Sequence, residues 1–110
     1  MIEKTIGKME EAVDGATAIP EEKKAELRGL ISQLRNEITT LSETHREIAL
    51  SIADFSQTST RRATGEDEDQ HLLASSLEDL STTVKTFEVS HPGLVSTVNN
   101  FCNALADIGI

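Results

Sequence analysis

The sequence predicts an all-α protein organised as a long antiparallel helical hairpin, and three observations support this fold class. Apolar residues recur at alternating steps of four and three through the middle of the chain, which marks one face of a long helix packed against other helices. The same spacing returns in the last third of the chain. A polar segment without periodic apolar residues separates the two runs, as the loop of a hairpin would. The first run consists of Leu27, Ile31, Leu34, Ile38, Leu41, His45, Ile48, Ile52 and Phe55.

Residues 1–15 are expected to form a short N-terminal helix. Ile2, Ile6, Met9 and Val13 follow the same four–three spacing and would form one apolar face. Gly15 is a typical residue for ending the helix. Helices this short are marginal in isolation, so the segment either docks on the rest of the chain or frays.

The second element is predicted to be one long helix over residues 20–57. Pro20 suits the first helical position because its missing N–H leaves no bond unmade there, and Glu21 and Glu22 complement the positive end of the helix dipole. Such a helix would be about 57 Å long at 1.5 Å per residue, so it needs partners along its whole length. Small residues beside its apolar stripe favour a bundle of more than two helices. These residues include Ser42, Thr44, Ala49, Ser51 and Ala53.

The segment 56–70 is predicted to be the loop of the hairpin. It is polar and contains Gly65, and the acidic run Glu66 to Asp69 ends it. The run lacks the alternating ligands, central glycine and closing glutamate of a calcium-binding EF-hand loop. We therefore interpret it as a solvated turn that also supports the start of the following helix.

Residues 69–108 form the second arm, and its apolar stripe keeps one heptad phase throughout. Pro92 and Gly93 interrupt the helical pattern, so a kink or break is expected at Ser90, His91 and Pro92. Two alternatives remain, a single kinked rod or two short antiparallel helices joined by a tight turn. The preserved phase favours the kinked rod. Folding at the loop would place Leu73 opposite Phe55, Phe87 opposite Leu41, and Phe101 opposite Leu27.

Length and charge limit the possible classes of protein. A chain of 110 residues is one domain, 1–110, and its net charge of −9 argues against nucleic-acid binding and against an anionic membrane surface. The acidic N-terminal segment has no continuous apolar run, so we expect neither a signal peptide nor a membrane span. The single Cys102 excludes an internal disulfide and fits a reducing compartment, and a cytoplasmic location follows as an expectation.

The last quarter of the chain contains Phe87-Glu88 followed by His91-Pro92 and Leu94, and it closes with the run from Ala104 to Ile110. On these residues the chain resembles a family of small bacterial proteins described as domain of unknown function 4404. The Pro-Glu-Glu-Lys opening and leucine-rich helix from Pro20 to Leu41 are also similar. The resemblance implies a bacterial helical protein without an assigned activity or cofactor, and it supplies no site residues.

No constellation of residues predicts chemistry, so we expect no catalytic residues, no cofactor and no metal. No two histidines have the i, i+4 spacing of a shared metal site, and no nucleophile–base pair or glycine-rich phosphate loop occurs. His45 falls on the core stripe of the first arm. A polar residue at one core position fixes register and partner number, and a histidine there would make assembly pH-sensitive.

The sequence therefore favours a non-enzymatic helical scaffold or interaction module that forms a homo-oligomer, with a dimer preferred. An adaptor that binds a helix of a heterologous protein is the first alternative. A metal- or ligand-binding helical bundle is the second.

Overall fold

In the computed structural model, residues 2–65 and 72–109 are described, and the helices there run antiparallel, each one to the next. No strand occurs in this part of the chain, so the predicted all-α class is confirmed. None of these helices is both long enough and apolar enough to cross a membrane. The helices are α1 (Ile2–Gly15), α2 (Glu21–Ser42), α3 (Arg46–Ala63), α4 (Leu73–Lys85) and α5 (Pro92–Gly109).

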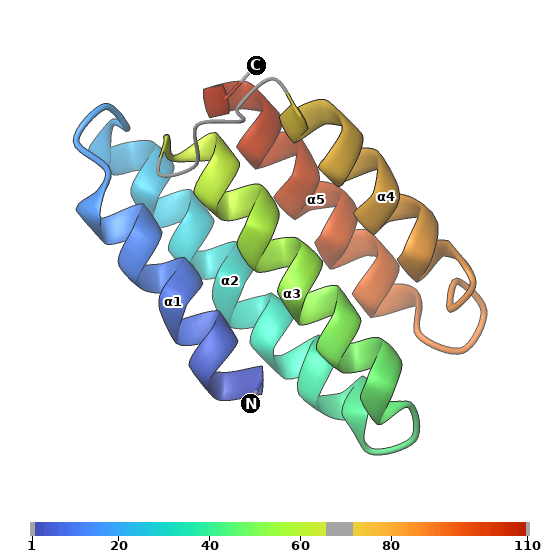
Figure 1. Cartoon of the computed structure of the whole chain (residues 1–110). Coiled ribbons are helices and arrows are strands. Elements are labelled where there is room, and N and C mark those ends of the chain that lie inside the picture. The colour runs from blue at the N-terminus through green and yellow to red at the C-terminus, as the bar shows by residue number, and fades with distance from the viewer. Residues whose placement is uncertain (1, 66–71, 110) are drawn as a thin grey trace.

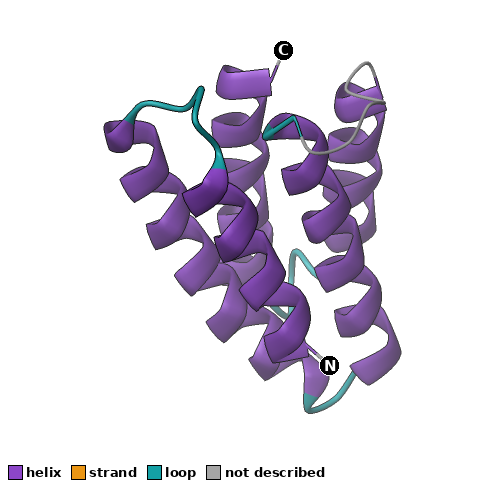
Figure 2. Ribbon diagram, turned by 60° about the vertical axis from the view of Figure 1, so that its left-hand side comes forward, coloured by secondary structure: helices purple, strands orange, loops and turns teal. Residues whose placement is uncertain are grey.

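The helices form two layers (Figure 1). Helices α1, α3 and α4 lie side by side in one layer, with α3 in the middle. Helix α2 packs behind α1 and α3, and α5 packs behind α3 and α4. The connections from α1 to α2, from α2 to α3 and from α4 to α5 lie at the ends of the bundle, as the rotated view in Figure 2 shows. The chain thereby buries one apolar core between short helices, with a Cα radius of gyration of 12.8 Å.

The N-terminal helix docks on this core, which resolves the alternative of a frayed terminus. Ile6, Met9 and Val13 are completely buried. They are spaced so that they lie on one face of α1, and this face meets α2 and α3. Burying such a face supplies the stability that an isolated short helix lacks.

The prediction of one continuous helix over 20–57 is wrong, because α2 ends at Ser42 and α3 begins at Arg46. His45 has φ −137° and ψ 64°, which is not helical. Hydroxyl side chains around the break bond back to helix carbonyls, and such bonds compete with the helical pattern. Ser42 Oγ donates to the Thr39 carbonyl at 2.6 Å, and Thr44 Oγ1 donates to the Leu41 carbonyl at 3.4 Å. The break lets both halves pack in a molecule 37 Å long, where a rod of about 57 Å would not fit.

Because of this break, the heptad phase does not continue into α3. His45, Ile48 and Phe55 are exposed, although the sequence pattern places them in the core. The buried face of α3 consists mainly of small residues, so neighbouring helices can approach closely. The predicted pairing of Phe55 with Leu73 across the hairpin is wrong, because the hydrogen bond from Ser59 to Ser76 sets a register of α3 and α4 in which Leu73 lies opposite the end of α3. The buried residues of α3 are Ala49, Ile52, Ala53, Ser56, Ser59, Thr60 and Ala63.

The second arm is two helices and not a kinked rod. Helix α4 ends at Lys85 and α5 begins at Pro92, so the break includes the predicted Ser90, His91 and Pro92 but starts earlier. Proline at the first position of α5 needs no N–H partner, which explains where the new helix starts. The apolar stripe of this arm was predicted correctly. Its buried members are Leu73, Leu77, Leu80, Val84, Phe87, Leu94, Val98, Phe101 and Leu105.

The predicted loop 56–70 is also displaced, because α3 continues to Ala63. The acidic run from Glu66 to Asp69 lies outside the described residues, and so does the predicted helix start at Asp69. In the first turn of α2, Lys23 pairs with Asp107 of α5 at 3.7 Å. This contact agrees with the antiparallel arrangement predicted for these two parts of the chain.

Candidate functional site

The structure brings His45 and His91 together at one end of the bundle. Both rings lie beside Phe87, with ring centroids 5.2 Å and 6.0 Å from it, and the two histidine rings are 6.5 Å apart. His45 Nδ1 lies 2.8 Å from Thr44 Oγ1. His45 is exposed and His91 is half-buried. The expectation that His45 lies in the core is therefore wrong, because α2 ends before it. The register and pH-sensing role assigned to His45 stays a prediction.

Cys102 is a buried thiol between α5 and α4. Its Sγ lies 3.8 Å from the carbonyl oxygen of Leu77, and burial raises the pKa of the thiol to about 11. The thiol therefore stays protonated at neutral pH, and a protonated thiol is a poor nucleophile. This geometry agrees with the reading of Cys102 as a small core residue.

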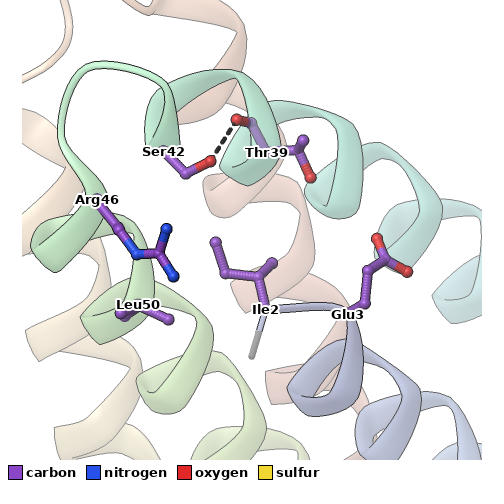
Figure 3. A pocket seen from close by; sticks show the side chains of 6 residues that line it. All are labelled: Ile2, Glu3, Thr39, Ser42, Arg46 and Leu50. Carbon is purple, nitrogen blue, oxygen red and sulfur yellow. Dashed lines mark hydrogen bonds between the residues drawn. The ribbon is translucent and has the colours of Figure 1, made fainter.

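A cavity of about 260 Å³ opens where α1 begins, beside the turn between α2 and α3. Figure 3 shows Ile2 projecting into it and the guanidinium of Arg46 pointing toward Ile2. Arg46 is exposed, and it forms no ion pair with any residue of the described ranges. The cavity thus combines the apolar side chains of Ile2 and Leu50 with the guanidinium of Arg46 and the carboxylate of Glu3, which pairs with Arg35 at 3.2 Å. The residues that line it are Ile2, Glu3, Thr39, Ser42, Arg46 and Leu50.

A second surface feature is an apolar stripe on α3, formed by Ile48 and Phe55. Their exposed fractions are 37% and 41%. They share one side of the helix with Arg62, whose Nη1 lies 3.5 Å from the Leu72 carbonyl at the start of α4. The stripe therefore lies on the α4 side of α3. Leu72, just before the first residue of α4, is also 38% exposed.

Within residues 2–65 and 72–109, no group of three or more His, Cys, Asp and Glu side chains could hold a metal ion. The two histidines that meet at Phe87 come from separate turns, and sequence spacing gave no sign of their proximity. The cavity at Arg46 was also missed, because its lining residues come from three helices and follow no motif.

Comparison with known proteins gives one match. The family model for domain of unknown function DUF4404 matches residues 24–110, which include most of α2 and all of α3 to α5. Searches among curated proteins and among solved structures give no match. The match confirms the resemblance found in the sequence.

Proposed function

We propose that this chain, which belongs to the DUF4404 family, is a non-catalytic helical module whose copies associate through the apolar stripe of Ile48 and Phe55. The observation that carries the proposal is the position of these two large side chains. They lie seven residues apart on one side of α3, and each leaves more than a third of its surface in water. A second copy that covers the stripe would remove this apolar surface from water.

A twofold arrangement fits the stripe. Two α3 helices packed antiparallel about Ser51 would place Ile48 of one copy on Phe55 of the other, and the reverse contact follows by symmetry. Ser51 lies between the two apolar side chains and is small and exposed, so it permits close approach at the crossing point. These features support a homodimer as the preferred oligomer.

Charge and composition support the same class of function. A net charge of −9 makes nucleic-acid and anionic-membrane partners unfavourable. A buried, protonated Cys102 leaves no reactive thiol at neutral pH. The one cysteine also supports a cytoplasmic location, which we propose together with the function.

Sedimentation velocity over a range of protein concentrations tests the proposal. Wild type is expected to shift from monomer to dimer as concentration rises, whereas Ile48→Lys with Phe55→Lys stays monomeric because the charges cannot be buried unpaired. Val89→Lys is the matched control, since Val89 is 97% exposed and lies outside the stripe. A wild type that remains monomeric up to about millimolar concentration would contradict self-association.

A further inference from the structure

His45 and His91 form a pair of imidazoles at the end of the bundle where two turns meet. His45 lies in the turn between α2 and α3, and His91 lies directly before α5. Their ring centroids are 6.5 Å apart, and both rings pack against Phe87, whose side chain is buried. The spacing rule that excluded a shared metal site applies to two histidines on one helix. Here two separate turns bring the imidazoles together.

Backbone hydrogen bonds hold both histidines in place. The N–H of His45 donates to the Leu41 carbonyl at 2.8 Å, and its carbonyl accepts from the N–H of Ala49 at 3.0 Å. The N–H of His91 donates to the Phe87 carbonyl at 2.7 Å. The backbone therefore fixes where the two side chains start, and only their torsions remain to be adjusted.

The hydroxyl of Thr44 sets the tautomer of His45. It donates its single proton to the Leu41 carbonyl at 3.4 Å, so its oxygen accepts the hydrogen bond from His45 Nδ1, 2.8 Å away. In the neutral ring Nδ1 then carries the proton, and Nε2 keeps a free lone pair. Histidines that bind metals are oriented in the same way, by a hydrogen bond from the nitrogen that does not touch the ion. His45 is exposed, so an ion can reach Nε2 from solvent.

The separation of the two rings suits one shared ion. A zinc ion lies about 2.0–2.1 Å from an imidazole nitrogen, which places it about 3.2 Å from the ring centroid. Two rings on one ion are then about 5 Å apart at a tetrahedral angle and about 6.4 Å apart on opposite sides of the ion. From the observed 6.5 Å, an approach of about 1 Å or less reaches this range. A small rotation of the exposed His45 side chain supplies it.

The surroundings of the pair favour a cation. Within three residues of either histidine, the sequence has three carboxylates, Glu43, Glu47 and Glu88, and one cationic side chain, Arg46. All four side chains are exposed. The guanidinium of Arg46 points toward Ile2 (Figure 3). The excess of negative charge therefore attracts positive ions to this end of the bundle.

From this geometry we propose that His45 and His91 together bind one divalent transition-metal ion, through Nε2 of His45 and one ring nitrogen of His91. Within residues 2–65 and 72–109 no third His, Cys, Asp or Glu completes the group, so water molecules fill the other coordination positions. Imidazole ligands suit Cu²⁺, Ni²⁺ and Zn²⁺, whereas Mg²⁺ and Ca²⁺ prefer oxygen. The ion joins two turns of one copy and stabilises the folded chain, whether or not copies associate.

Isothermal titration calorimetry of the full chain with Zn²⁺ tests the site. The titration is made in the Cys102→Ala background, which removes the one thiol of the chain as a competing ligand. Two of the four ligands of a structural zinc site are present, so we expect one ion per chain with a Kd on the order of 10 µM. Cu²⁺ should bind more tightly than Zn²⁺, and Mg²⁺ should not bind the pair.

Variants of the histidines show whether both imidazoles hold the ion. His45→Gln and His91→Gln should each weaken Zn²⁺ binding about tenfold or more, because one imidazole remains. His71→Gln is the matched control, since it removes the third histidine of the chain and leaves the pair intact. It should not change the Kd.

The role of Thr44 has its own pair of variants. Thr44→Val should weaken Zn²⁺ binding about tenfold, because His45 Nδ1 loses the hydrogen bond that orients the ring. Thr40→Val is the matched control, since the Thr40 hydroxyl donates to the Asn36 carbonyl at 3.0 Å. It should leave the Kd unchanged.

Nuclear magnetic resonance of the histidine ring nitrogens identifies the binding atoms. Without metal, at about pH 8, His45 should show the Nδ1–H tautomer. Zn²⁺ should shift Nε2 of His45 and one ring nitrogen of His91, and it should leave His71 unchanged. The urea midpoint should rise by about 1 M or more at a Zn²⁺ concentration of about 100 times the Kd, and this rise should be lost in His45→Gln.

Four results would overturn the proposal. They are a Kd for Zn²⁺ above about 1 mM, a loss of affinity in His71→Gln equal to that in His45→Gln, a shift of only one of the two rings, and binding of one ion per two chains. The last result would mean that the ligands come from different copies. Equal affinities of Thr44→Val and Thr40→Val would overturn the positioning role of Thr44.

Discussion

Replacing Phe55 or Phe101 with alanine makes the same chemical change at two positions that the heptad pattern treats as equivalent. In the structure the two side chains differ, because Phe101 is 0% exposed and Phe55 is 41% exposed. The two substitutions therefore test whether the break between α2 and α3 turns the predicted stripe of α3 out of the core.

The expected free energies of unfolding follow from these exposures. Phe101→Ala removes a fully buried ring and leaves a cavity, so it should destabilise by about 3–5 kcal/mol. Phe55→Ala removes roughly 100 Å² of covered apolar surface and leaves a site that water can fill. At about 25 cal/mol per Å², and with part of that area retained by the alanine, the loss is about 1–2 kcal/mol. The middle values of these two ranges differ by about 2.5 kcal/mol.

Urea unfolding followed by far-ultraviolet circular dichroism measures this difference, because the chain has no Trp or Tyr to report by fluorescence. With m-values of about 1–2 kcal/mol/M, the two midpoints should lie about 1 M urea or more apart. Low-micromolar protein keeps self-association from stabilising wild type, and a tenfold higher concentration checks for it. Equal losses of 3–5 kcal/mol would refute the reasoning, since they would place Phe55 in the core as a continuous helix does.

Two further predictions concern the second half of the chain. In the folded state the pKa of Cys102 is raised from 9.0 to about 11, so the unfolded chain loses this proton first and stability falls as pH rises from 9 to 11. Urea midpoints of wild type should decline more steeply over this range than those of Cys102→Ala, and parallel curves would contradict the burial of the thiol. A Cβ at Gly93 would come within 2.7 Å of Glu37 Oε1. Gly93→Ala in wild type should therefore leave the free energy of unfolding nearly unchanged, because this close contact offsets the gain in helix propensity. In a Glu37→Ala background it should stabilise by about 0.5–1 kcal/mol, and a double-mutant cycle without coupling would contradict this contact.

The sequence predicted most of the helical character and much of the core. The spacing of apolar residues placed Leu27, Leu34 and Phe101 correctly, because those helices each present one face to the core. The break before α5 was also foreseen, since Pro92 and Gly93 exclude a regular helix interior.

The break between α2 and α3 was missed because no glycine or proline marks it. The side-chain hydrogen bonds of Ser42 and Thr44 compete only weakly with helical hydrogen bonding. The packing of both helices in one core therefore decides that the helix breaks here. The apolar spacing continues unchanged through Ile48 and Phe55, so it cannot reveal the break. Which face of α3 is buried is decided by tertiary contacts and not by the spacing.

The candidate sites could not be predicted for a similar reason. The cavity at Arg46 joins Ile2, Thr39 and Leu50, which come from three helices and are far apart in sequence. His45 and His91 were identified separately, but only the folded arrangement of the two turns brings their rings to 6.5 Å. Such sites depend on the packing of the helices, and that packing was predicted incorrectly at the turn between α2 and α3.

The fold itself is tested most directly by the distance between residues 23 and 64. In the structure Lys23 and Thr64 line the same cavity at one end of the bundle. Nitroxide labels at Lys23→Cys and Thr64→Cys, in a Cys102→Ala background, allow the distance to be measured by double electron–electron resonance. The described helices predict a single narrow distribution centred well below 37 Å, the length of the molecule. A distribution centred at about 60 Å, the span of an unbroken helix at 1.5 Å per residue, would contradict the account.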